Sequence, residues 1–321
     1  MSRMRVLVCG SNYGRAYITA LAREPRKFQL AGILAQGSLR SQQLAARNGV
    51  PLYRSTNELP DNIDLAAAAM NSAAWPMVLQ LIRRGIHVLC EHPYPADSLN
   101  KAMNLARERE VQFHVNGHFV NLPAPKAFVR DCQRAMKLAP PEFMEVMATE
   151  RSLYGAWDIL MAATGSLQPL RVHVLSRRSK LVLLEGKLGK VFARISVQVS
   201  GKRGRSRLPD GSPGYLLDQR LTVAFPTGLL TLLSAAGPVL WNSTPAHVVN
   251  QKPLWTILGG QATRTRTELA EQRIQANVEA LNSIRQSILG HGTPEIQKPH
   301  HILQVSRAWE SIGRQLYSES R

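Results

Sequence analysis

Short apolar runs alternate with helical patterns over the first 118 residues of the chain. The apolar runs predict strands, and the segments between them carry apolar side chains at helical spacing, as at Tyr17, Ile18 and Leu21. The predicted strands span residues 5–9, 28–35, 63–70, 87–90 and 112–116, and the predicted helices span residues 13–23, 41–48, 75–84 and 98–109. Such alternation is typical of a parallel sheet covered by helices. We therefore expect residues 1–118 to form a doubly wound Rossmann domain of the α/β class.

The pattern changes after a proline-marked loop at residues 122–125 and one helix that ends near Ala139. Consecutive strand-like runs follow, with a helix at residues 155–164 among them. These runs span residues 143–150, 172–176, 181–185, 191–199, 221–225, 229–233 and 239–241. Two helices with apolar stripes complete the chain, and residues 201–214 are expected to form a loop. We expect residues 119–321 to be an α+β domain on a mostly antiparallel open sheet.

Composition favours a soluble protein of two domains. A chain of 321 residues with 44% hydrophobic residues can bury a core in each domain. No apolar run approaches the roughly 20 residues of a membrane span, and the start of the chain lacks the apolar core of a secretory signal. We therefore expect a cytoplasmic protein without membrane association. Cys9, Cys90 and Cys132 have no metal-ligand spacing and are expected to be reduced, without a metal site.

The charge of the chain is strongly basic, with 40 Lys and Arg against 22 Asp and Glu and a net charge of +18. Two basic clusters, at residues 177–180 and 202–207, lack the interleaved aromatic residues of a base-stacking surface. Zinc-finger and RNA-recognition motifs are also absent from the sequence. Nucleic acid is therefore disfavoured as a partner. A solvated basic face and a docking face for an acidic protein partner remain as alternatives.

The first predicted strand runs into Gly10-Ser11-Asn12-Tyr13-Gly14 and then a helix. Glycines permit a tight turn, and the helix start offers N–H groups to a dinucleotide pyrophosphate. The full G-x-G-x-x-G spacing is missing, because Gly10 and Gly14 are four residues apart and Asn12 replaces a middle glycine. An ordinary strand-to-helix turn is the alternative interpretation.

The end of the second predicted strand carries Gly37, Ser38, Arg40 and Ser41 and no acidic residue. An NAD site usually has Asp or Glu there for the ribose hydroxyls, whereas a 2′-phosphate is held by hydroxyls and arginine. These residues therefore predict NADP(H) as the cofactor. The alternative is that Ser38 or Ser41 caps the following helix while Arg40 is only exposed.

Four segments of the first domain resemble a known family. Residues 6–14, 34–41, 49–53 and 85–93, the last ending in Glu91-His92-Pro93, are similar to thiazolinyl imine reductases of pyochelin- and yersiniabactin-type siderophore biosynthesis. These enzymes are a branch of the Gfo/Idh/MocA oxidoreductase superfamily. The likeness is tight over residues 5–120, looser to residue 165, and returns at residues 301–309.

The resemblance implies that NADPH reduces the C=N bond of a thiazoline ring to a thiazolidine. The intermediate would be tethered as a thioester to a carrier domain of a nonribosomal peptide synthetase. Hydride would reach the ring carbon and a proton the ring nitrogen. The resemblance also implies a homodimer. An NADPH-dependent reductase of another imine or carbonyl compound, and an NADP-binding protein without turnover, are the alternatives.

His92 is the first catalytic candidate. The wider superfamily carries lysine at this position, in Glu-Lys-Pro, and an imidazole that titrates near neutrality suits proton delivery to the ring nitrogen. His92 would act as the general acid or orient the water that does, and the alternative is that it only holds its loop by hydrogen bonds. The expected cofactor-binding residues are Gly10, Ser11, Asn12, Tyr13, Gly14, Gly37, Ser38, Arg40, Ser41, Asn71, Glu91 and His92.

Tyr154 is the second catalytic candidate, because it precedes the segment in which sugar-oxidising relatives carry a His-x-x-Asp motif. Gly155 occupies the histidine position here and only Asp158 remains, so oxidation of a polyol is disfavoured. Where the imine reductases carry a tyrosine after the sixth strand, this chain has Phe119, and the adjacent His118 is a possible substitute. The expected substrate-binding residues are Asn116, His118, Phe119 and Tyr154. His114 is expected to be a buried structural histidine.

Overall fold

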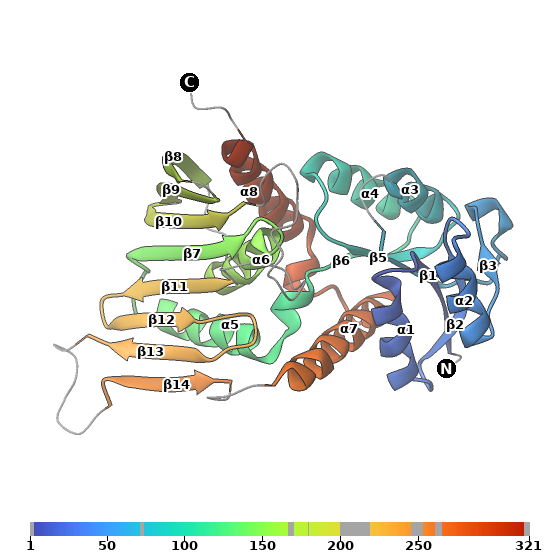
Figure 1. Ribbon diagram of the computed structural model, residues 1–321, viewed down its shortest axis with the longest axis horizontal. Coiled ribbons are helices and arrows are strands. Elements are labelled where there is room, and N and C mark those ends of the chain that lie inside the picture. Colours follow the sequence, from blue (N-terminus) through green and yellow to red (C-terminus); the bar gives the residue numbers. More distant parts are fainter. Residues whose placement is uncertain are drawn as a thin grey trace. The chain divides into compact units, whose positions relative to one another are not determined.

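The chain folds into two compact units in the computed structural model (Figure 1). The structure describes residues 3–70, 74–165, 170–178, 180–199, 219–244, 253–260 and 265–317. The first unit comprises residues 1–118 and 270–303, and the second comprises residues 119–269 and 304–321. The segment 270–303 thus lies in the first unit, whereas a single division after residue 118 was expected from the sequence.

The first unit is built on a six-stranded sheet in which all neighbouring strands are parallel. Its strand order, β3-β2-β1-β4-β5-β6, reverses direction between β1 and β4, and dinucleotides bind beyond the carboxyl ends of the strands at such a point. The strands are β1 Met4–Cys9, β2 Phe28–Leu34, β3 Leu52–Tyr53, β4 Leu65–Ala68, β5 His87–Glu91 and β6 Phe113–Asn116. The expected doubly wound domain is confirmed.

Helices and short 3-10 turns connect these strands, because parallel neighbours need crossover connections. They are α1 Gly14–Arg23, α2 Leu39–Asn48, η1 Thr56–Glu58, α3 Trp75–Arg83 and α4 Ala96–Glu108. The late segment adds most of α7, Arg266–Ile288, and η5, Glu295–Gln297. Each of the four helices expected between the strands is present, and both of its ends lie within two residues of the expected bounds.

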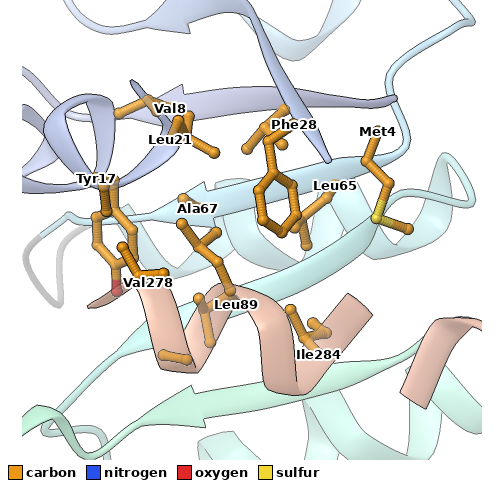
Figure 2. Packing of buried hydrophobic residues seen from close by; sticks show 14 of the residues in the cluster. Met4, Val8, Tyr17, Leu21, Phe28, Leu65, Ala67, Leu89, Val278 and Ile284 are labelled. Carbon is orange, nitrogen blue, oxygen red and sulfur yellow. The ribbon is translucent and has the colours of Figure 1, made fainter. Parts of the chain in front are cut away.

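Helix α7 completes the core of the first unit. Val278, Leu281 and Ile284 are buried in one cluster with side chains of α1 and of the central strands, including Tyr17 and Leu89 (Figure 2). Burying one such aliphatic side chain contributes on the order of 1.5–3 kcal/mol. The apolar stripe expected on this helix is therefore core packing. It explains why residues 270–303 belong with the Rossmann sheet.

The second unit is built on an eight-stranded sheet in the order β14-β13-β12-β11-β7-β10-β9-β8. Only the β7–β10 pair is parallel, so the expected mostly antiparallel sheet is confirmed. The strands are β7 Phe143–Thr149, β8 Leu170–Arg178, β9 Leu181–Leu188, β10 Val191–Gln198, β11 Arg220–Phe225, β12 Gly228–Leu232, β13 Val239–Ser243 and β14 Trp255–Gly259. The sequence did not predict β14, and the expected loop at residues 201–214 lies outside the described residues.

Helices cover this sheet and contact it directly. Helix α5, Pro123–Met136, contacts β12, β13 and β14, and α6, Leu153–Thr164, contacts β7 and β11. The remaining elements are η3, His118–Asn121, and α8, Pro299–Tyr317. The prolines expected in a loop lie instead in the first turn of α5, where a missing backbone N–H costs nothing. Among the described helices, none is long and apolar enough to cross a membrane.

His114 is an unsatisfied polar group in the core of the first unit. It lies on β6 opposite Leu89 of β5, and only 1% of its surface is exposed. Neither ring nitrogen has a hydrogen-bond partner among the described residues, and burial lowers the pKa of the imidazole to about 4. The ring is therefore neutral in the folded protein at neutral pH.

Replacing His114 with leucine should stabilise the protein and weaken its sensitivity to acid. The pKa of His114 is about 4 in the folded protein, below the ordinary value of 6.5. The free energy of unfolding of the wild type is therefore not reduced by this histidine above pH 6.5, and it falls as the pH drops toward 4. For this one histidine the loss between pH 7 and pH 5 is about 2 kcal/mol. Urea denaturation of wild type and H114L at both pH values measures it.

His291→Leu is the matched control, because His291 is exposed in the same unit. It should leave the pH dependence unchanged. A variant H114L that is less stable than wild type at pH 7, or equally acid-sensitive, would contradict the assignment.

Candidate functional site

The turn between β1 and α1 requires both of its glycines. Gly10 has φ +96°, and a Cβ there would lie 2.4 Å from the carbonyl oxygen of Ala69. A Cβ on Gly14 would lie 2.8 Å from a methyl carbon of Val8. The turn therefore passes close to the end of β4, and α1 begins close to β1. In the described structure no side chain caps α1, so its first N–H groups suit a pyrophosphate.

The loop between β2 and α2 lies beside that turn. Ser38 is the N-cap of α2, and its Oγ accepts from the N–H of Ser41 at 3.4 Å. The buried Ser41 hydroxyl donates to the carbonyl oxygen of Ser38 at 2.7 Å, so the cap and the second serine both shape the loop. Nε of Arg40 donates to Oγ of Ser11 at 3.3 Å. The structure thus brings the two expected cofactor-binding segments together, while Asn71 lies outside the described residues.

A buried polar cluster lies where β5 and β6 end. Glu91 and Asn116 are neighbours across these strands, and Nδ2 of Asn116 donates to Oε1 of Glu91 at 2.9 Å. The hydroxyl of Tyr17 on α1 also donates to this Oε1. Enclosure raises the pKa of Glu91, while the charge of His92 and the two hydrogen bonds act in the opposite direction. The carboxylate therefore accepts hydrogen bonds from two neutral donors and lies beside the charge of His92.

His118 is held in this cluster with φ +46°, which is uncommon for a residue with a side chain. Its N–H donates to Oδ1 of Asn116 at 3.0 Å, and its Nδ1 lies 3.4 Å from the Tyr13 hydroxyl and 3.4 Å from Oδ1 of Asn277. Burial, with a smaller effect from the charge of His92, lowers the pKa of His118 to about 4. His118 is therefore a neutral imidazole at neutral pH.

His92 is oriented by the backbone of β6. Its Nδ1 lies 2.7 Å from the carbonyl oxygen of Asn116. A carbonyl only accepts, so Nδ1 carries the hydrogen of this bond. The backbone of β6 therefore fixes the orientation of the His92 ring.

Helix α7 contributes two residues to the cluster that the sequence did not single out. Oδ1 of Asn277 accepts from Nδ2 of Asn116 at 2.9 Å. Burial raises the pKa of Tyr13 and lowers that of His118, and Arg273, one turn earlier, lies close enough for its charge to make a smaller contribution to both. These residues carry no motif, and more than 150 residues separate them from β6. Sequence pattern therefore had no signal for them.

The other two expected site residues belong to the second unit. Tyr154 lies in α6, is 3% exposed, and meets the ring of Trp309 edge-on at 6.3 Å. Phe119 lies in η3 against the start of the same helix. A Cβ on Gly155 would lie 2.5 Å from Cδ2 of Phe119 and 2.8 Å from Nε2 of Gln219. The space that a larger residue at position 155 would need is therefore occupied.

The described residues contain no group of three or more His, Cys, Asp or Glu side chains that could hold a metal ion. The polar groups of the first unit fit a dinucleotide instead. Its glycine turn and uncapped helix suit a pyrophosphate. Glu91 and Asn116 are the last residues of β5 and β6, and His92 follows β5 directly, so all three lie at the edge of the sheet where dinucleotides bind.

Asn277→Ala should destabilise the first unit without removing any apolar packing. It leaves a buried donor of Asn116 and the ring of His118 with one partner fewer, and such losses cost about 1–3 kcal/mol each. The free energy of unfolding from urea titration measures the effect. Asn282→Ala on the same helix is the control, because Asn282 is only partly buried and bonds to Lys27 and Glu24. Its cost should stay below about 1 kcal/mol, and equal losses in the two variants would contradict a special role for Asn277.

Comparisons with known proteins agree with this architecture. No curated protein sequence matches the chain. The UDP-N-acetylglucosamine 3-dehydrogenase GnnA from Acidithiobacillus ferrooxidans matches with a TM-score of 0.72 and 16% identity, over 97% of this chain and 96% of that chain. The WlbA dehydrogenase from Bordetella pertussis, solved with NADH and UDP-GlcNAcA, matches with a TM-score of 0.71 and 14% identity, over 98% and 95%.

An oxidoreductase from Agrobacterium radiobacter, solved with NAD+, L-tartaric acid and magnesium, matches with a TM-score of 0.70 and 12% identity, over 99% of this chain and 97% of that chain. At such identities these likenesses show the fold alone. Residues 4–117 also match the model of the Gfo/Idh/MocA oxidoreductase family with an NAD-binding Rossmann fold. Residues 4–117 are therefore similar to the NAD-binding domain of this oxidoreductase family, and the first unit of the chain has the Rossmann fold.

Proposed function

We propose that this protein uses NADPH to reduce the C=N bond of a thiazoline ring to a thiazolidine. The substrate would be a siderophore intermediate tethered to the carrier domain of a nonribosomal peptide synthetase. The observation that carries the proposal is the filled space at Gly155. The ring of Phe119 and the amide of Gln219 occupy the room that a catalytic histidine at this position would need. Together with His92 in place of lysine, this disfavours the removal of a hydroxyl proton from a sugar.

Reduction of an imine needs a hydride donor and a proton. NADPH, which the glycine turn after β1 and the β2–α2 loop would hold, would supply the hydride for the ring carbon. The C=N electron pair would then move to the ring nitrogen, and the nitrogen would take a proton. His92 suits the proton step, because histidine is the side chain that most often acts as a general acid and its Nδ1 bond to the Asn116 carbonyl fixes the ring in one orientation. His118 suits it less, since its lowered pKa keeps the ring neutral.

The choice of NADPH rests on the β2–α2 loop. No carboxylate lies among residues 35–41, and Ser38 and Arg40 are exposed there. A 2′-phosphate is attracted by these groups, whereas the ribose hydroxyls of NAD usually meet an acidic residue.

A carrier domain fits the basic surface of the chain, because carrier domains are commonly acidic and weak complementarity is enough for docking. Of the two basic clusters, residues 202–207 lie outside the described residues. In the other cluster, Arg177 donates hydrogen bonds to the carbonyl oxygens of Leu316 and Gln315. This arginine therefore also contacts the end of α8 within the second unit.

Anaerobic incubation with NADPH and a synthetic thiazolinyl thioester should consume one cofactor per product, with a product mass increased by two hydrogens. The same thioester on a carrier domain should react faster than the free analogue at equal concentration, and added salt should narrow the difference because surface electrostatics are screened. If the protein reduced open-chain imines or carbonyl compounds but not the thiazoline, the proposed substrate would be wrong. If the protein bound NADPH but turned over none of these compounds, the proposal that it is an enzyme would be wrong.

His92→Asn should lower the single-turnover reduction rate by about 100-fold or more, within the range typical of general acid catalysis. Asparagine can still donate to the Asn116 carbonyl but cannot deliver a proton. His300→Asn, at an exposed position, is the control. A loss below about threefold, which is under 1 kcal/mol of barrier, would leave His92 with only a structural role.

A further inference from the structure

A second arginine reaches the start of α2 from a loop that the sequence did not single out. Arg54 directly follows β3, whose Tyr53 pairs with Leu34 at the end of β2. Because the two strands are parallel, Arg54 emerges at the same edge of the sheet as the β2–α2 loop. Strand β3 is only two residues long, so no strand pattern marked this position.

The Arg54 guanidinium lies against the backbone of Gly37. A Cβ on Gly37 would lie 3.0 Å from Nε and 3.3 Å from Cζ of Arg54. Gly37 has φ +84° and precedes Ser38, the N-cap of α2. A side chain at position 37 would therefore be strained and would displace the arginine. Arg54 is thus adjacent to the residues already expected to meet the cofactor.

Arg40 adds a second cation to the same loop. Its Nε is bonded to Oγ of Ser11, and its terminal nitrogens have no hydrogen bond or ion pair with a described residue. The Arg54 guanidinium has none with a described residue either, and both side chains belong to exposed residues. The nearest carboxylate along the chain, that of Glu58, accepts from the backbone N–H of Arg54 at 2.8 Å and from the Ser55 hydroxyl at 3.2 Å. Its oxygens are therefore used by the turn at residues 54–58.

Two guanidinium groups beside an N-cap, whose terminal nitrogens bond to no described residue, fit a phosphate dianion. Each presents a planar fork of N–H donors that matches phosphate oxygens, and no carboxylate in the loop competes for them. In a Rossmann domain the end of β2 is where the adenosine ribose lies. We propose that Arg54 and Arg40 together clamp the 2′-phosphate of NADPH, so that Arg54 is a determinant of cofactor specificity. This proposal rests on the proposed choice of NADPH and does not depend on the identity of the imine.

Calorimetric titration separates the phosphate from the rest of the cofactor, because 2′,5′-ADP carries the 2′-phosphate and 5′-AMP does not. Arg54→Ala and Arg40→Ala should each lower the affinity for 2′,5′-ADP and for NADPH by about 10-fold or more, as expected for the loss of hydrogen bonds to a charged group. Both should change the affinity for 5′-AMP and NADH by less than about twofold. Arg54→Lys, which keeps the charge but loses the fork, should retain part of the affinity. These probes need no substrate.

Arg47→Ala is the matched control, because Arg47 is exposed in the last turn of the same helix. It removes one positive charge and should leave all four affinities unchanged. An Arg54→Ala protein that binds 2′,5′-ADP like wild type, while Arg40→Ala does not, overturns the clamp and leaves NADPH in place. A wild type that binds 2′,5′-ADP no better than 5′-AMP overturns the choice of NADPH, and the clamp with it.

Discussion

One residue, Asn116, joins segments of the first unit that are far apart in the sequence. Its carboxamide donates to Glu91 at the end of β5 and to Asn277 on α7, and accepts from the backbone of His118. Its carbonyl oxygen orients His92. Groups buried in this way lose more from an absent partner than they gain from a present one, so the whole cluster is held in a single arrangement. The geometry of the candidate site depends on it.

The same enclosure controls the charge of the cluster. It raises the pKa of Glu91 and lowers that of His118, so burial opposes ionisation of the acid and of the base alike. Neutral donors such as Tyr17 therefore satisfy the carboxylate, and the cationic Arg40 and Arg54 remain at the exposed edge, where water solvates them. The charged arginines thus lie where a cofactor phosphate is expected, and the hydrogen-bonded cluster around Asn116 lies where the nicotinamide end is expected.

The sequence predicted the parts of the fold that local pattern determines. Runs such as those of β1 and β5 and the glycine turn at Gly10 were recognisable, because buried parallel strands are continuously apolar and tight turns need glycine. The stripe on α7 was recognised as packing, but periodicity shows only which face is buried and not against what. Asn277 and Arg54 could not be found, since a lone polar residue in a helix or after a two-residue strand has no pattern. Their roles arise from contacts between distant segments.

The division of the first unit between two stretches of sequence also affects its synthesis. The chain leaves the Rossmann sheet at residue 118 and returns to it at residue 270, so the core side chains of α7 are made some 150 residues after β6. At about 5–20 residues per second, the ribosome needs roughly eight to thirty seconds for that interval. During this time the apolar face around Val8, Leu65 and Leu89 has no α7 to cover it. The nascent first domain therefore waits, incompletely buried, while the second is being translated.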